Sequence, residues 1–180
     1  IRTFEWTNDL TEVSQQAAQG LLLSNHSYGT PAASVPTWFI GAYSSVSKTW
    51  DQISHTYLYY LMVPAAGNEG NFNNVDATTP GFDKLTGNKT AKNNLVVANA
   101  QDANVDVNGN LVSVLINSGS SQGPADDLRI KPDITGNGTG VFSSTATNNT
   151  SYSSFSGTSM ASPNVMGTLL LVQQHYQNVN

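Results

Sequence analysis

The sequence predicts an α/β fold with a mainly parallel sheet and helices on its faces. Segments with helical periodicity alternate with short apolar runs along the 180 residues, which is typical of parallel strands joined by helices. The apolar runs are continuous rather than alternating, as expected of strands that are covered on both faces. The longest of them, Leu58 to Ala66, falls well short of the roughly 18 apolar residues that a membrane span requires.

The first helix is expected from Asp9 to Gln19. Leu10, Val13 and Ala17 recur on one helical face, and acidic residues favour its N-terminal turn. A short buried strand, Leu21 to Asn25, is expected to follow this helix.

A proline-containing loop at 30–39 leads into a second helix, expected from Ser44 to about Tyr57. One face of this helix carries an apolar stripe at helical spacing, formed by Val46, Trp50, Ile53 and Tyr57. The run from Leu58 to Val63 is then expected to form the second buried strand.

The C-terminal half is expected to contain two further strands and one long helix. The stretch 71–94 is rich in Asn, Gly, Thr and Lys and is interpreted as a surface excursion. Strands are expected at 95–100 and, just after an Asn-Gly turn signal, at 111–117. The stretch 119–156 is expected to be loop-rich with short strands, such as 140–143. The final helix, 158–177, is apolar almost all round, which predicts burial at the centre of the domain.

The composition indicates one mildly acidic domain. Twelve acidic and seven basic residues give a net charge of -5, which argues against nucleic acid and anionic membranes as partners. The absence of cysteine excludes disulfides and thiolate metal sites. Only 11% of the residues are charged, whereas there are 20 Asn, 20 Ser and 18 Thr. Such a neutral polar surface favours a secreted or cell-surface protein.

The most informative segment is 155–163, Phe-Ser-Gly-Thr-Ser-Met-Ala-Ser-Pro. A glycine turn here delivers Ser159 to the first turn of the last helix, at the positive end of the helix dipole. Negative charge that develops beside this hydroxyl is stabilised, so Ser159 is a candidate nucleophile. An ordinary helix cap uses the same residue types, and the geometry alone leaves both interpretations open.

A second candidate residue, Asn68, lies in segment 65–70, Ala-Ala-Gly-Asn-Glu-Gly, directly after an expected strand. Active sites of open α/β sheets form at the carboxyl ends of strands. A carboxamide at this position can donate a hydrogen bond to an anionic oxygen. A plain turn has the same composition, so this segment is also ambiguous when taken alone.

Together, these two motifs resemble those of the subtilisin-like serine peptidases, the subtilases. Gly-Thr-Ser-Met-Ala-Ser-Pro at 157–163 is similar to the family's nucleophile motif, and segment 65–70 is similar to its oxyanion segment. Segments 23–29, 123–127 and 129–133 also resemble family stretches, so the resemblance covers about 20–177. It implies a subtilisin-like three-layer fold and serine-type endopeptidase activity through an acyl-enzyme.

The resemblance also assigns roles to individual residues. Ser159 is the expected nucleophile, and Asn68 is the expected donor to the oxyanion. Substrate-binding residues are expected on two walls of a cleft, with Ser27, Tyr28 and Gly29 on one wall and Ala66 and Gly67 on the other. Tyr28 at the rim favours large or apolar substrate side chains.

The family's catalytic Asp and His motifs do not occur in this sequence. Subtilases order their triad as Asp, His and Ser, with Asp-Thr/Ser-Gly and His-Gly-Thr-His motifs upstream of the substrate strand. His26, His55 and His175 have other neighbours and are not expected to act as the base. We therefore expect 1–180 to be a partial catalytic domain, incomplete at the N-terminus, whose Asp and His lie upstream of Ile1. Such a fragment should be practically inactive, because losing triad members costs about a million-fold in subtilisin.

Two other functions stay open. A non-catalytic pseudoprotease or peptide-binding module would keep the cleft without the triad. The serine-carboxyl peptidases are related, but their serine motif lacks the Met-Ala-Ser-Pro continuation.

The chemistry of the site requires no cofactor. Subtilases often carry structural calcium, but no spacing here forms a calcium loop, and no metal ligand is assigned. The candidate oxygen ligands are Asp76, Asp83, Asp102, Asp106, Asp126 and Asp127. The expected partners are polypeptide substrates, and an unpaired sheet edge would favour self-association.

Overall fold

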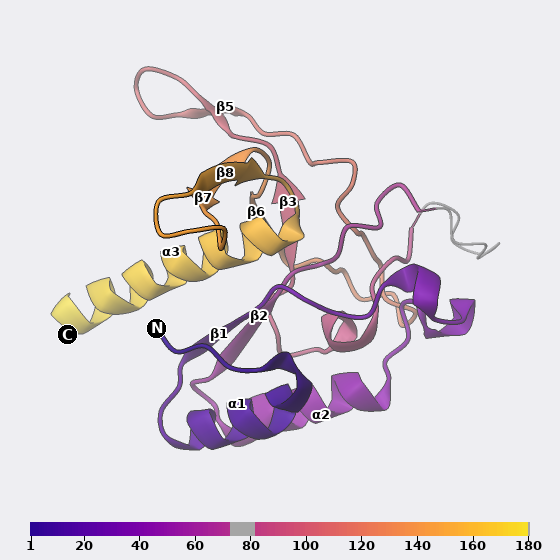
Figure 1. Cartoon of the computed structure of the whole chain (residues 1–180). Helices are drawn as coiled ribbons and strands as arrows, with labels where there is room; N and C mark the ends of the chain where they lie inside the picture. The colour runs from indigo at the N-terminus through magenta and orange to yellow at the C-terminus, as the bar shows by residue number, and fades with distance from the viewer. Residues whose placement is uncertain (73–81, 180) are drawn as a thin grey trace.

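The computed structural model describes residues 1–72 and 82–179, and a parallel sheet lies at its centre (Figure 1). In this sheet β1 (Leu23–His26) pairs with β2 (Leu61–Pro64), and β3 (Val97–Ala100) pairs with β6 (Ile134–Asn137). Backbone hydrogen bonds join β2 to β3, from Ala66 N to Val97 O and from Leu95 N to Met62 O, each 2.9 Å long. The strand order is therefore β1-β2-β3-β6, all parallel, which confirms the predicted α/β class.

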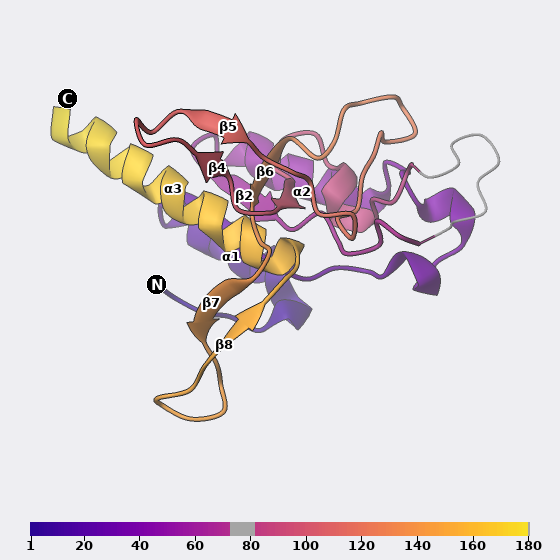
Figure 2. The same cartoon turned by 90° about the horizontal axis from the view of Figure 1, so that it is seen from above.

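Helices cover both faces of the sheet. Figures 1 and 2 show α1 (Asp9–Ala18) and α2 (Ser45–Thr56) on one side of β1 and β2, and α3 (Thr158–Val179) on the other. This arrangement confirms the expected three layers. The described residues also form four short 3-10 helices. η1 (Trp6–Asn8) directly precedes α1, whereas η2 (Ala32–Ser34), η3 (Thr37–Phe39) and η4 (Gly87–Thr90) lie in the connections.

The bounds of the first two helices agree with the sequence signals to within a residue or two. Helix α2 begins with a capping box, in which the Ser44 hydroxyl accepts from Ser47 N at 3.5 Å and Ser44 N donates to the Ser47 hydroxyl at 3.2 Å. Two of the amide groups that lack helical partners at this end are satisfied in this way.

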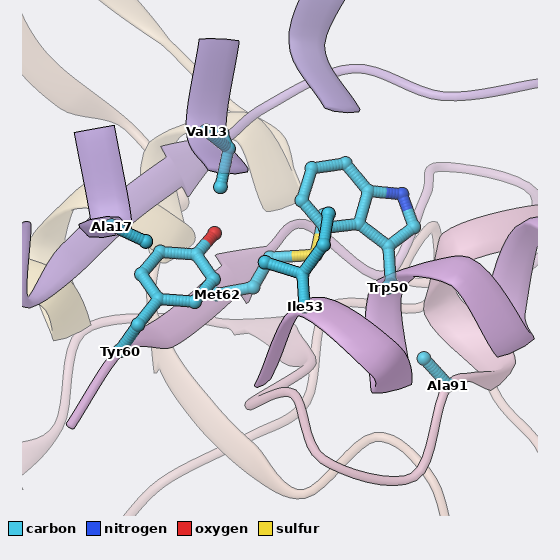
Figure 3. Close-up of a cluster of buried hydrophobic side chains, with 7 residues drawn as sticks. All are labelled: Val13, Ala17, Trp50, Ile53, Tyr60, Met62 and Ala91. Atoms are coloured by element: carbon cyan, nitrogen blue, oxygen red, sulfur yellow. The ribbon is translucent and has the colours of Figure 1, made fainter. Parts of the chain in front are cut away.

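The first hydrophobic core lies between the sheet and the two N-terminal helices (Figure 3). Met62 points into it from β2 and is fully buried, and the Trp50 side chain from α2 is 2% exposed. The cluster comprises Val13, Ala17, Trp50, Ile53, Tyr60, Met62 and Ala91. The apolar stripes read from the sequence therefore face the sheet, except that Val46 at the start of α2 is 41% exposed.

The second core lies on the opposite face, under the N-terminal half of α3. Val63, next to Met62 in β2, points to this side because side chains alternate along a strand. The cluster comprises Leu23, Val63, Val97, Ala161 and Val165. Gly136 in β6 permits the close approach of the helix, since a Cβ there would lie 2.7 Å from Val165 Cγ2 and 2.9 Å from Ala161 O.

The interpretation of 71–94 as a surface excursion is wrong for most of its described part. Residues 73–81 lie outside the described residues, but every residue from 83 to 91 is buried. The two buried threonines of this stretch have partners within the chain: Thr90 Oγ1 lies 2.7 Å from Ser47 Oγ, and Thr86 Oγ1 donates to Thr30 O at 2.6 Å. Polar residues that find such partners can be buried, so the composition of this stretch did not reveal its position.

The expectation that α3 is buried along its length is also wrong. Its buried residues, Thr158, Ala161, Ser162 and Val165, all lie in its first half. Val172 and Tyr176 on the same stripe are 59% and 66% exposed. The reason is geometric, because the C-terminal half extends past the sheet (Figures 1 and 2). Within 1–72 and 82–179, no helix is both long enough and apolar enough to cross a membrane.

Two antiparallel hairpins complete the described structure. β4 (Asn104–Val105) pairs with β5 (Leu111–Ser113), and β7 (Val141–Ser144) pairs with β8 (Tyr152–Phe155). The predicted strand at 111–117 is thus shorter and forms an exposed hairpin around the Asn-Gly turn, whereas β6 takes the place beside β3. The first residues of the strand predicted at 58–63 instead form a turn, with Leu58 78% exposed.

Candidate active site

The segments that follow β1 and β2 meet the N-terminus of α3 at one edge of the sheet. They enclose a pocket of about 160 Å³. Because parallel neighbours end at the same edge, residues far apart in sequence converge there. The lining residues are Ser27, Tyr28, Gly29, Thr30, Pro31, Ala65, Gly67, Asn68, Glu69, Lys89, Thr158 and Ser159.

Ser159 is held against the end of β1 by a reciprocal pair of hydrogen bonds. Its hydroxyl donates to Ser27 O at 3.2 Å, and the Ser27 hydroxyl donates to Ser159 O at 3.0 Å. The second bond has a simple cause. Pro163 lies inside α3 and has no N–H to offer the carbonyl four residues earlier, which is that of Ser159. Ser27 therefore satisfies the carbonyl that the proline leaves without a helical partner.

The Asn68 side chain is oriented by the residue next to the serine. Its Oδ1 accepts from Thr158 N at 3.0 Å and from Thr158 Oγ1 at 3.1 Å. Thr158 Oγ1 also accepts from Gly67 N at 3.1 Å. With Oδ1 committed, Nδ2 is left as the free end of the carboxamide, and no residue in the described ranges accepts from it. The side chain is exposed.

Six of the seven residues expected at the site line this one pocket. Ala66 does not, because it is fully buried and packs with Leu85 and Val96; Ala65 lines the pocket in its place. Thr158 and Lys89 were not among the expected residues. Thr158 lies within the serine motif, but nothing in the sequence around Lys89 distinguishes it from a surface lysine.

None of the three histidines is a hydrogen-bond partner of Ser159 within the described ranges. His55 and His175 are exposed on α2 and α3. His26 is 3% exposed, and both of its ring nitrogens are engaged, with Nε2 lying 2.6 Å from Ser24 Oγ and Nδ1 2.6 Å from the Tyr28 hydroxyl.

The hydrogen bonds around His26 assign the tautomer of its neutral form. The Tyr28 hydroxyl donates to Asp9 Oδ2 at 2.9 Å, so it accepts from Nδ1, and Nε2 accepts from Ser24. Burial lowers the pKa of His26 to about 4, although the Asp9 carboxylate opposes the shift. His26 is thus a buried structural histidine that also anchors Tyr28.

Of the candidate calcium ligands, Asp83 and Asp126 both approach Gly41, with one carboxylate oxygen of each within 2.4 Å of the position of a Cβ there. Asp76 lies outside the described residues, and the part of the chain that is described holds no group of three or more His, Cys, Asp or Glu able to bind a metal. Asp106 accepts from the amides of Asn108 and Asn110, Asp127 pairs with Arg129, and Asp102 accepts from Asn137. These three carboxylates therefore have partners within the chain.

This combination of a parallel sheet, a serine at the start of α3 and an asparagine beyond β2 is that of a subtilisin-like fold. The chain belongs to the subtilase family, whose model matches residues 3–180.

Named relatives are proteinases, and each match covers a small part of them. The chain is 44% identical over 61 residues to a PII-type proteinase and to a PI-type proteinase, both of Lactococcus lactis subsp. cremoris. The matched segment is 34% of this chain and 3% of each proteinase. The chain thus corresponds to a small fraction of the length of these relatives.

Solved structures share the fold over almost the whole chain. The self-cleaved protease domain of PatA matches 98% of the chain with a TM-score of 0.64 and 19% identity, and the maturation protease PagA matches 98% with 0.60 and 21%. Sphericase matches 88% with 0.55 and 24%. The chain covers 55%, 53% and 45% of these three chains, which is about half of each.

Proposed function

We propose that these residues form the nucleophile and oxyanion half of a serine endopeptidase active site. The observation that carries the proposal is the fixed carboxamide of Asn68, whose Oδ1 is held by Thr158 beside Ser159. Membership of the subtilase family and the names of the lactococcal proteinases and of the PatA protease domain support a peptidase.

In the proposed reaction an extended polypeptide pairs with the backbone of Ser27, Tyr28 and Gly29. Ser159 Oγ attacks the scissile carbonyl, and its proton passes to a histidine outside this chain. The negative oxygen of the tetrahedral adduct accepts from Asn68 Nδ2 and from Ser159 N, a first-turn amide without a helical partner. Expulsion of the amine leaves an acyl-enzyme on Ser159, which water hydrolyses. The reaction needs no cofactor.

Labelling of the full-length protein tests this proposal. A fluorophosphonate should modify Ser159, as located by mass spectrometry, and the protein should cleave fluorescent casein. Ser159→Ala should abolish both signals. Ser154→Ala, on the exposed strand β8, should leave both unchanged. Casein cleavage that survives Ser159→Ala would refute the proposal.

The 180 residues alone should show no practical activity. Loss of the base lowers the rate by about a million-fold, a magnitude carried over from subtilisin. The same casein assay on the isolated chain checks this, and clear turnover would overturn it.

The alternative is a peptide-binding module that retains the cleft. It is favoured by the absence of Asp-x-Gly and His-Gly-x-His motifs from these residues. The sequence upstream of Ile1 distinguishes the two functions, since both motifs should occur there in a peptidase. For either function we expect an extracytoplasmic location and polypeptide ligands.

A further inference from the structure

A buried lysine lies in the same pocket as the serine and the asparagine. Lys89 comes from η4, a segment some 70 residues before Ser159, and it is only 4% exposed. It lines the pocket together with Ser27 to Pro31 on one side and Gly67 to Glu69 on the other. The proposed mechanism gives this side chain no role.

The ammonium of Lys89 lies between the two walls of the pocket. A Cβ added to Gly29 would lie 2.9 Å from Lys89 Nζ, and one added to Gly67 would lie 3.3 Å from it. The Glu69 carboxylate also faces the second wall, because its Oε2 would lie 2.5 Å from the Cβ at Gly67. Side chains on either wall would therefore collide with the lysine or displace it. Only because both positions are glycine can the charge approach both walls.

The hydrogen-bonding capacity of Lys89 is poorly used. An ammonium has three donors, yet across the described part of the chain its one acceptor is Thr86 Oγ1, at a distance of 3.5 Å. The ion pairs found in the same residues, Arg129–Asp127 and Lys131–Asp133, do not include it. A buried cation with so few partners is unfavourable, and an anionic ligand would relieve this.

Glu69 does not remove the need for such a ligand. Its Oε2 accepts from the Ser121 hydroxyl at 2.8 Å, and the residue is half-buried, so that water also solvates the carboxylate. Burial lowers the pKa of Lys89, and the opposing attraction of Glu69 is the smaller effect. Of the two charged side chains in the pocket, Lys89 is therefore the more deeply buried, and Glu69 is the more solvated.

We propose that Lys89 makes this pocket select an acidic side chain in the substrate residue that precedes the scissile bond. The assignment rests on the proposed function, since it places the scissile bond at Ser159. A Glu or Asp side chain would accept the unused hydrogen bonds of Nζ between Gly29 and Gly67. This differs from the large or apolar preference that Tyr28 suggested, because the buried ammonium of Lys89 lines the same pocket.

Peptide binding to the full-length protein tests the assignment without catalysis. The Ser159→Ala form is titrated with fluorescent peptide amides that differ only in the residue before the scissile position, which is Glu, Gln, Leu or Lys. The blocked C-terminus leaves the Glu side chain as the variable carboxylate. A charge-assisted hydrogen bond predicts that Glu binds about tenfold to a hundredfold more tightly than Gln.

Two lysine variants distinguish an effect of the buried Lys89 charge from an effect of the protein's overall charge. Lys89→Met should remove the preference for Glu over Gln, whereas Lys92→Met removes a charge from an exposed position nearby and should preserve it. Equal binding of Glu and Gln, a preference for Lys, or a preference that survives Lys89→Met overturns the assignment. The first two results need no variant at Lys89, so the test holds even if Lys89→Met does not fold.

Cleavage of the same peptides by the protein with Ser159 intact distinguishes failure of this assignment from failure of the proposed function. Ser159-dependent cleavage without a preference for Glu refutes only the role of Lys89. Binding that prefers Glu, with no cleavage of any peptide, refutes the peptidase and retains the pocket.

Discussion

Asn68→Asp separates the two functions that the structure gives to the Asn68 carboxamide. The aspartate keeps an oxygen that can accept from Thr158 N and Thr158 Oγ1, which lie 3.0 and 3.1 Å from Oδ1. It replaces the Nδ2 donor with a second oxygen. The local structure should therefore survive, while stabilisation of the oxyanion is lost. Asn68→Leu removes both functions and is the matched comparison.

The expected magnitudes follow from these contacts. Loss of one oxyanion donor lowers kcat by about 10² to 10³, so both variants should lose at least this much turnover with little change in KM. The two hydrogen bonds to Oδ1 are worth about 1 kcal/mol each. Because Asn68 is exposed and water replaces part of each bond, Asn68→Leu should lower the free energy of unfolding by about 1–2 kcal/mol and Asn68→Asp by less.

The assay combines steady-state cleavage of a peptide substrate by the full-length protein with urea unfolding of each variant. Thr158→Ser retains both hydrogen-bonding groups and serves as the control, with turnover close to that of the parent. Near-normal kcat in Asn68→Asp would refute the reasoning, because that variant has no amide to donate. Equal loss of stability in the two Asn68 variants would refute the role assigned to Oδ1.

Three further predictions concern residues that support the site or form the hydrophobic core. Burial holds the pKa of His26 at about 4 in the folded protein, against 6.5 in the unfolded chain. Between these two values the unfolded chain binds a proton that the folded protein does not. About 3 kcal/mol of the stability present above pH 6.5 should therefore be lost as the pH falls to 4. Urea titrations across this range should show a flatter profile for His26→Gln, and an unchanged profile would contradict the assignment. Ser27→Ala leaves the Ser159 carbonyl without its 3.0 Å partner and should cost about 1–3 kcal/mol in calorimetry, whereas no change would show that water replaces the hydroxyl. Trp50→Ala should cost about 3–5 kcal/mol in the same measurement, while the 72% exposed Trp38→Ala should cost little, and equal costs would contradict the core assignment.

The sequence predicted those parts of the fold whose signals are local. The stripes of α1 and α2 combine residue type and position within short segments, so the helix bounds were recovered. The motif around Ser159 is equally local, and six of the seven residues expected at the site line one pocket. Asn68 could be placed beside Ser159 because strand ends in a parallel sheet share one edge. Ala66 was expected on the pocket wall, but Ala65 lies there instead. The two differ because side chains alternate along an extended segment, so a shift of one residue changes which side chain faces the pocket.

The parts that the sequence did not reveal depend on distant partners. The segment around Thr86 and Thr90 is polar but buried, because its acceptors lie near residues 30 and 42–47. Conversely, Val172 in α3 is apolar but exposed, since the helix continues beyond the sheet. Lys89 is the clearest case, as its place between Gly29 and Gly67 exists only once the chain has folded.

A crystal structure of the full-length protein with a peptide boronate tests the central claim most directly. The boronate forms a tetrahedral adduct that carries a negative oxygen where the oxyanion would lie. We expect boron bonded to Ser159 Oγ and one boronate oxygen within about 3 Å of Asn68 Nδ2. An adduct on another residue, or a boronate oxygen directed away from Asn68, would contradict the account.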